Sequence, residues 1–177
     1  MKSITKFFGV IAFCGAALGA TFASAATVPV EVYAKQNSVS ASVLAGANTG
    51  LSFTTGDKFV VEVDEGDTWQ IGNKLPRHLG NADGMTQTRY YTLFGQTFNH
   101  GTLVGRIGGG DFFEIGTYFK GLANATGILE LFIWDVNFKD NSGSVTAFVS
   151  PVPLPAAAPL LLSGLLAFGA LRRRRKA

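Results

Sequence analysis

The chain has 177 residues and a formal net charge of +3, with 15 Lys or Arg against 12 Asp or Glu. The basic excess comes from Lys2, Lys6 and the basic residues at 172–176, so the segment between them has eight Lys or Arg, twelve Asp or Glu and a formal charge of −4. Such a mildly acidic segment, without a basic stripe, excludes nucleic-acid binding as its function.

Residues 1–26 have the pattern of a secretory signal peptide. Lys2 and Lys6 give a positive start, an apolar stretch follows, and an A-x-A cleavage motif lies at residues 23–25. We expect cleavage at this motif, the alternative being an uncleaved anchor helix. The only cysteine, Cys14, lies inside this segment, so the mature chain is expected to have neither a disulfide nor a thiolate site.

Residues 27–150 are expected to form one all-β domain. Helical periodicity is nearly absent, and short runs alternate apolar and polar side chains with a period of two. Breaks rich in Gly, Asn and Asp, such as GANTG and GNADG, separate these runs. Many short strands at this spacing predict a sandwich or a barrel. The expected strands are Val28–Ala34, Lys58–Val63, Thr88–Phe94, Thr102–Ile107 and Ser144–Val149.

Three further segments have patterns of their own. The run GILELFIW, at residues 127–134, is apolar after its glycine except at Glu130, and is expected to be a central strand between two layers. The segment GRIGGG, at 105–110, lacks the spacing of a nucleotide loop and is expected to be a hairpin turn. The longest irregular piece is expected at 72–87, and loops of that length are often binding loops.

The segment WDVNFKDNSGS, at residues 134–144, follows the apolar run directly. Asp135 comes first, and Asp140 and Asn141 lie five and six residues further on. A chain reversal would bring their oxygens together with a main-chain carbonyl near Phe138, which is the kind of ligand set that calcium uses. The alternative is an ordinary tight turn, because Asp, Asn, Ser and Gly are also the usual turn residues.

Residues 151–177 form a third segment. The motif VPLPA precedes an apolar stretch at 156–171 and a basic tail. This order resembles the PEP-CTERM class of bacterial sorting signals, in its VPLPA variant. The resemblance implies a transmembrane segment at 156–171, recognition by an exosortase-type peptidase, and delivery to the cell surface or exterior of a Gram-negative bacterium. A plain membrane anchor is the alternative. The matching residues are Val152, Pro153, Leu154, Pro155, Ala156, Arg172 and Arg173.

The segments GTLVGRIG at 101–108, ILELFIWD at 128–135 and DNSGS at 140–144 are similar to the C-terminal half of the calcium-dependent galactophilic lectins of bacteria, the PA-I type. The resemblance is clearest over residues 101–149. It implies a small jelly-roll-like β-sandwich of about eight strands. It also implies a calcium ion at one end of the sandwich, shared directly with two sugar hydroxyls.

The resemblance also implies a ligand set. Asp135 matches the family's ligand at the strand end, Asn141 matches an asparagine ligand, and Asp140 sits where the family has another asparagine. The implied metal ligands are Asp135, Asp140 and Asn141 with the backbone carbonyls of Ile71 and Phe138, and the implied sugar-binding residues are Asp135, Asn141, His78, Asn81 and Asp83. The acidic loop is two residues shorter than the family pattern, and the family's His-Pro-Asp-Gln segment has no clear equivalent.

We therefore expect an exported envelope protein with a calcium-dependent carbohydrate-binding module. Trp69 or Tyr90 would pack on the sugar, although each is more typical of a core. The alternative is a structural or adhesive extracellular matrix protein that keeps the fold without the ligand.

An enzyme is not expected. The only histidines are His78 and His100, and neither G-x-S-x-G nor H-E-x-x-H is present. His100 is expected to be a turn residue, and nothing in the spacing favours a glycosidase pair of Asp83 and Asp135.

Overall fold

The computed structural model describes residues 26–73, 78–87 and 89–153. Residues Ser24–Leu154 form one compact unit. The signal peptide expected at 1–26 therefore lies outside the described residues except for Ala26, and so does the transmembrane segment expected at 156–171. Within the described ranges, no helix has the length and apolar character needed to cross a bilayer.

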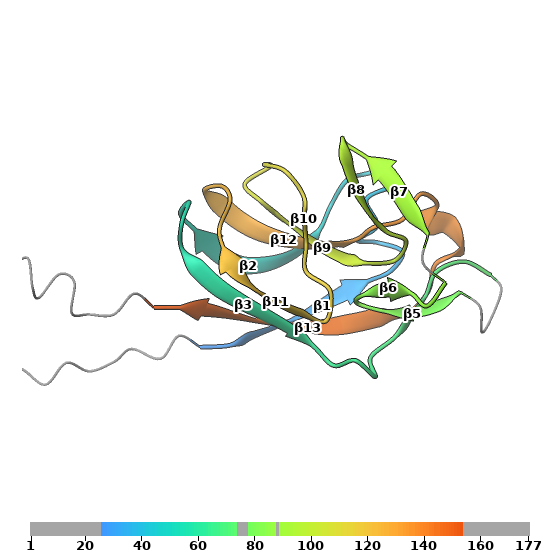
Figure 1. Ribbon diagram of the computed structural model, residues 1–177, viewed down its shortest axis with the longest axis horizontal. Helices are drawn as coiled ribbons and strands as arrows, with labels where there is room; N and C mark the ends of the chain where they lie inside the picture. Colours follow the sequence, from blue (N-terminus) through green and yellow to red (C-terminus); the bar gives the residue numbers. More distant parts are fainter. Residues whose placement is uncertain (1–25, 74–77, 88, 154–177) are drawn as a thin grey trace, which may run out of the picture. The chain divides into compact units, whose positions relative to one another are not determined.

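Two four-stranded antiparallel sheets pack face to face as a β-sandwich (Figure 1). In spatial order, sheet A contains β1 (Val28–Tyr33), β13 (Ser144–Val152), β3 (Lys58–Val63) and β11 (Tyr118–Leu122). Sheet B contains β10 (Phe113–Glu114), β9 (Leu103–Ile107), β12 (Gly127–Ile133) and β2 (Ala47–Phe53). The all-β sandwich expected from the sequence is thus confirmed, and these two sheets hold its eight strands.

Smaller elements gather beside the two sheets. A three-stranded sheet contains β4 (Trp69–Gln70), β5 (Leu79–Asn81) and β6 (Gly84–Met85), and a hairpin contains β7 (Tyr90–Leu93) and β8 (Gln96–Asn99). A 3-10 turn, η1, spans Phe138–Asp140.

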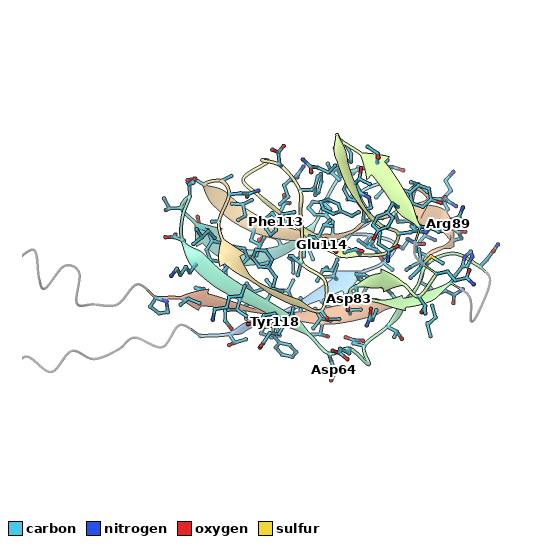
Figure 2. All side chains as sticks on the ribbon, in the orientation of Figure 1. Asp64, Asp83, Arg89, Phe113, Glu114 and Tyr118 are labelled. Carbon is cyan, nitrogen blue, oxygen red and sulfur yellow. The ribbon has the colours of Figure 1, made fainter. Side chains whose placement is uncertain are left out.

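The main core lies between the sheets because the strands alternate as the sequence predicts. Val30 and Val32 of β1 point inward with Val61 and Val63 of β3, while residues between them point outward. Figure 2 shows side chains filling the space between the sheets, with Phe113 of β10 among them. Burial of such apolar side chains is the dominant stabilising term in a domain of this size.

The run GILELFIW forms β12 and its continuation, in the middle of sheet B as expected. Leu129, Leu131 and Ile133 face the main core, whereas Phe132 and Trp134 face a second apolar cluster on the other side of the sheet. Side chains of the β7–β8 hairpin, including Phe98, cover this second cluster. The strand is therefore apolar on both faces because both faces are buried.

Two sequence expectations were wrong. The segment 72–87 is not one irregular loop, because β5 and β6 lie in it and pair with each other. The break expected at GANTG is not a break, because residues 47–50 belong to β2, which pairs with β12. In both places hydrogen bonding to a neighbouring strand outweighs the low β-propensity of Gly and Asn.

The last strand extends further than the expected domain end at residue 150. Pro151 is paired with Phe59 and Val152 with Lys58. Val152 and Pro153, the first residues of the sorting motif, are thus described, and its remaining residues lie outside the described ranges. The pairing of β1 with β13 places Val28 opposite Val149 and Tyr33 opposite Ser144.

Candidate functional site

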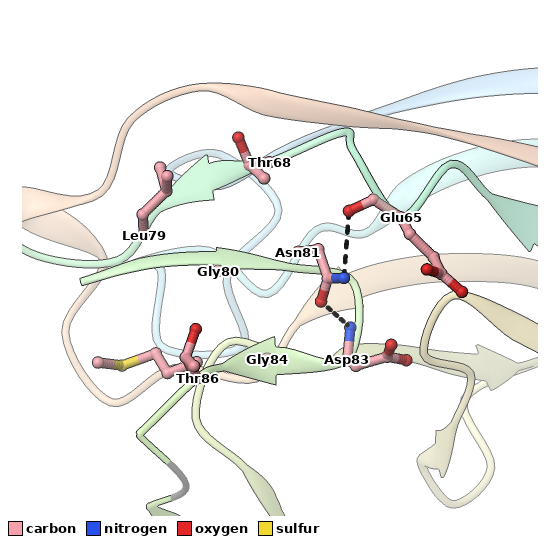
Figure 3. A pocket seen from close by; sticks show the side chains of 9 residues that line it. Glu65, Thr68, Leu79, Gly80, Asn81, Asp83, Gly84 and Thr86 are labelled. Atoms are coloured by element: carbon pink, nitrogen blue, oxygen red, sulfur yellow. Dashed lines mark hydrogen bonds between the residues drawn. The ribbon is translucent and has the colours of Figure 1, made fainter. Parts of the chain in front are cut away.

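Asn81 and Asp83 lie at the turn between β5 and β6, beside a hollow that Thr68 and Glu65 also line (Figure 3). The Asn81 side chain donates to the main-chain oxygen of Glu65 at 3.3 Å and accepts from the Asp83 amide at 3.0 Å. The Asp83 carboxylate accepts from the amide and hydroxyl of Thr117 at 2.7–3.1 Å. These two expected sugar ligands are held by the β5–β6 turn, and no hydrogen bond joins either of them to Asp135.

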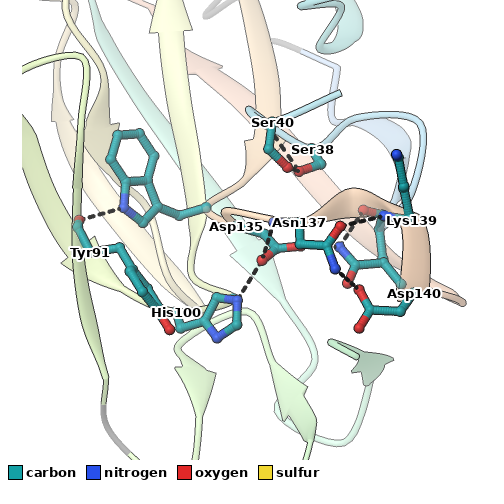
Figure 4. Close-up of polar contacts among 12 residues, drawn as sticks. Ser38, Ser40, Tyr91, His100, Asp135, Asn137, Lys139 and Asp140 are labelled. Atoms are coloured by element: carbon teal, nitrogen blue, oxygen red, sulfur yellow. Dashed lines mark hydrogen bonds and ion pairs between the residues drawn. The ribbon is translucent and has the colours of Figure 1, made fainter. Parts of the chain in front are cut away.

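Asp135 lies directly after β12 and is buried, with 1% of its surface exposed. Its Oδ1 accepts from His100 Nε2 at 2.5 Å and from the Asn137 amide at 3.1 Å. Its Oδ2 accepts from Asn141 Nδ2 at 2.5 Å. Figure 4 shows Asp135 between His100 on one side and the η1 loop on the other.

The surroundings of Asp135 keep its carboxylate ionised. Burial by itself raises the pKa of this group. The hydrogen bonds from His100, from the Asn137 amide and from Asn141 outweigh burial and bring the pKa below its ordinary value. A buried anion at the end of a rigid strand is suited to binding a cation.

His100 is the site residue that the sequence analysis missed. Its main chain lies in a turn as expected, but its side chain reaches Asp135, and only 11% of that side chain is exposed. Because the Asp135 carboxylate can only accept, Nε2 carries the proton in this contact. The ring of Tyr91 packs edge-on against the His100 ring at 4.9 Å between centroids. His100 therefore fixes the orientation of Asp135 from the side of the β7–β8 hairpin.

The η1 turn brings the second half of the acidic loop back to Asp135. Asn137 caps the turn and its Nδ2 donates to Asp140 Oδ1 at 2.8 Å. The Phe138 carbonyl accepts from the Asn141 amide at 3.3 Å. Asn141 is 4% exposed, and its Nδ2 also donates to the Ala34 carbonyl at 3.1 Å.

Asn141 Oδ1 is buried and has no hydrogen-bond partner. A buried polar atom without a partner costs about 1–3 kcal/mol. Most such atoms in folded proteins are paired with protein or with an ordered water or ion, so an unpaired one needs an explanation. Asn141 Oδ1 belongs to a side chain that also contacts Asp135, and it is an oxygen of the kind that binds hard cations.

The early turn after β4 reaches the same loop, as the resemblance implies. Gln70 and Ser142 exchange two main-chain hydrogen bonds at 2.9 and 3.0 Å, and the Ile71 amide donates to the His78 carbonyl. A Cβ atom at Gly72 would lie 2.5 Å from His78 Nδ1 and 3.4 Å from Asp140 Oδ2. The structure thus brings the neighbours of Ile71 together with His78 and Asp140.

The two aromatic candidates differ in exposure. Trp69 is 1% exposed and its Nε1 donates to the Gly101 carbonyl at 3.1 Å, so it is a core residue that does not contact ligand. Tyr90 is 67% exposed on β7, so the expectation that it belongs to the core was wrong. Only Tyr90 remains available at the surface.

The donor set of this site fits a hard cation. Across the described part of the chain, no group of three His, Cys, Asp or Glu side chains is arranged to hold a metal ion. The set here contains two carboxylates, from Asp135 and Asp140, and the amide oxygen of Asn141. Calcium accepts amide and main-chain oxygens beside carboxylates, whereas zinc prefers nitrogen and sulfur ligands. The residues present therefore fit calcium.

The described domain is an antiparallel β-sandwich with a lectin-like fold. Among solved structures it is similar to the one described as "EclA N-terminal domain; PllA-like lectin", with a TM-score of 0.53 and 22% sequence identity. The likeness covers 71% of this chain and 96% of that chain. No family model and no curated protein matches the chain.

Proposed function

We propose that residues 27–150 form a calcium-dependent carbohydrate-binding module. The observation that carries the proposal is the contact between two buried groups, the ionised Asp135 carboxylate and the Asn141 amide, whose oxygen lacks a partner. The lectin-like fold supports the same function, since the similar solved domain is described as a lectin.

The proposed ion ligands are the side chains of Asp135, Asp140 and Asn141 and the main-chain carbonyls of Ile71 and Phe138. A bound calcium ion would supply Lewis acidity and open coordination positions for vicinal sugar hydroxyls. Asp135 and Asn141 would hydrogen-bond those hydroxyls, with His78 at the rim of the site. We assign no catalytic residue and propose that the domain is not an enzyme.

We also propose that the chain is exported and sorted. The signal peptide at 1–26 supports passage out of the cytoplasm. The VPLPA motif, the apolar stretch at 156–171 and the basic tail support anchoring in the inner membrane, recognition by an exosortase-type peptidase, and a final location at the cell surface or outside the cell. The test is to express the chain in a Gram-negative host with and without an exosortase and to measure the mass of the chain. Processing only in the presence of the exosortase supports sorting. An identical mass in both hosts contradicts sorting.

The alternative is a structural or adhesive matrix protein on the same fold. Hydrogen bonds of Asn81 with Glu65 and of Asp83 with Thr117 favour it, because they already engage the side chains of two expected sugar ligands. A melting temperature that does not respond to calcium or EDTA would support this alternative, since a ligand that binds only the native state raises stability.

Titration calorimetry of the compact unit Ser24–Leu154 tests the proposal. This unit has its own core and is suited to separate production. Galactose and other simple sugars are titrated with calcium and with EDTA. We expect heat of sugar binding when calcium is present. We expect none with EDTA, and none for Asn141→Leu. Asp111→Asn, at an exposed position, is the matched control. Absence of heat in every condition would reject sugar binding.

A further inference from the structure

Basic side chains gather around the candidate site, although the segment between the basic ends of the chain has a formal charge of −4. The described residues contain six Lys or Arg side chains, and half of them lie in segments that contact the residues of the site. A local excess of one sign of charge attracts ligands of the opposite sign. The three residues are Lys35, Arg89 and Lys139.

Arg89 lies on the side of the site that the β7–β8 hairpin forms. Its main-chain oxygen accepts a hydrogen bond from the His100 amide at 2.7 Å, and His100 contacts Asp135. The Arg89 guanidinium lies 5.8 Å from the centroid of the Tyr91 ring, and this ring packs edge-on against the ring of His100. Figure 2 shows Arg89 near one end of the described domain. The guanidinium is therefore held one ring away from the residue that orients Asp135.

The two lysines lie on other segments of the site. Lys35 directly follows Ala34, whose carbonyl accepts a hydrogen bond from Asn141 Nδ2 at 3.1 Å. Lys139 belongs to η1 and is next to Asp140, as Figure 4 shows. Both lysines are exposed to solvent. Basic side chains thus come to the candidate site from three different parts of the chain.

These positive charges are available to a ligand. Within the ranges that the structure describes, none of the three side chains forms an ion pair with a carboxylate. Asp135 is 1% exposed and is already engaged by His100, so the exposed basic side chains do not neutralise it. The charges of Asp135 and Asp140 would be balanced by the calcium ion of the proposed function. With that ion bound, the three basic side chains give the site an excess of positive charge.

We propose that the site binds an acidic saccharide, one that carries a carboxylate as a uronic acid does. This inference rests on the proposed function, because it names the class of ligand for the same site. A guanidinium binds a carboxylate through paired hydrogen bonds, and a lysine supplies a point charge that a carboxylate also accepts. A carboxylate oxygen is in addition a ligand that calcium accepts. A neutral sugar would use none of the three charges.

Titration calorimetry of the unit Ser24–Leu154 with matched sugars tests the inference. Each pair consists of a neutral sugar and the acid that differs from it only at C6. The pairs are galactose and galacturonate, glucose and glucuronate, and mannose and mannuronate. Every sugar is titrated with calcium and with EDTA, and titration of each acid into calcium without protein gives the background heat.

In calcium, we expect at least one acid to bind about tenfold or more tightly than its neutral partner at low salt. The advantage should shrink when the ionic strength is raised from about 0.01 M to about 1 M, because the Debye length falls from about 30 Å to about 3 Å. Binding of the neutral partner should not respond to salt, because that sugar carries no charge.

Charge variants assign the preference to the three residues. Replacement of Lys35, Arg89 or Lys139 by glutamine should each weaken binding of the acid about threefold or more, and should change binding of the neutral sugar by less than about twofold. Arg89→Lys keeps the charge and should retain most of the affinity. The matched control is Lys120→Gln, an exposed lysine on β11 without an ion pair in the described residues, which should leave both affinities unchanged. Thermal melting verifies that each variant is folded.

The outcomes separate this inference from the proposed function. Neutral sugars that bind as tightly as their acids, or acid binding that none of the three glutamine variants weakens, would overturn the inference and leave the proposed function standing. Acid binding that persists in EDTA would place the ligand outside the calcium site and would also overturn the inference. Absence of heat with every sugar would reject the proposed function and this inference with it.

Discussion

Replacement of Asp135 by asparagine tests the buried network at the candidate site. The Asp135 carboxylate accepts hydrogen bonds from His100, Asn137 and Asn141. An asparagine has one oxygen, so its NH2 group must face at least one of these donors in either rotamer. At least one buried donor then loses its partner, which costs about 1–3 kcal/mol. We expect Asp135→Asn to lower the free energy of unfolding by about 2 kcal/mol.

Urea unfolding followed by tryptophan fluorescence measures this change, because Trp69 and Trp134 are both buried in the folded domain. Calcium supplies the second readout. At a concentration 100 times Kd it should stabilise the wild-type domain by about 2.7 kcal/mol and should leave Asp135→Asn unchanged. Asp111→Asn, at an exposed position, should resemble wild type in both assays. If Asp135→Asn stays within about 0.5 kcal/mol of wild type and keeps its response to calcium, the reasoning is refuted.

Three further predictions concern pH, the core and a turn. The pKa of Asp135 lies below its ordinary value of 3.8 in the folded domain. The stability contributed by its ionised form is therefore complete above about pH 4 and is lost as pH falls through the lowered pKa. As pH is lowered, the urea midpoint of Asp135→Asn should fall less steeply than that of the wild-type domain. Leu131→Ala should cost about 2–5 kcal/mol in urea unfolding, because Leu131 is fully buried; a loss below about 1 kcal/mol would contradict its place in the core. Gly95→Ala should cost about 1 kcal/mol because Gly95 has a φ of 77° with nothing near its missing Cβ; an unchanged midpoint would show that the turn adapts.

The sequence predicts the long alternating strands well because their periodicity reflects which face is buried. Val30 and Val32 of β1 and Val61 and Val63 of β3 point inward as their spacing requires. The strands β5 and β6 have only three and two residues, which is too short for a period to be recognised. They pair because β4 pairs with β5 and because Ala82 and Met85 pack into the main core. No local sequence pattern predicts these contacts.

The candidate site could be predicted only in part. Asp135 and Asn141 were identifiable because they lie in one loop directly after an apolar strand. The contact between His100 and Asp135 joins residues 35 positions apart, and beside Gly101 the sequence around His100 is typical of a turn. The contacts of Asn81 with Glu65 and of Asp83 with Thr117 join residues 16 and 34 positions apart, so no local pattern predicts them.

The burial of β12 on both faces determines how rigid the candidate site is. Ile133 is fixed in the main core and Trp134 in the second cluster, so Asp135 cannot move without disturbing two packed regions. The amide hydrogens of β12 should exchange with solvent only when the whole domain unfolds. Much of the entropy cost of ordering this carboxylate is therefore contributed during folding.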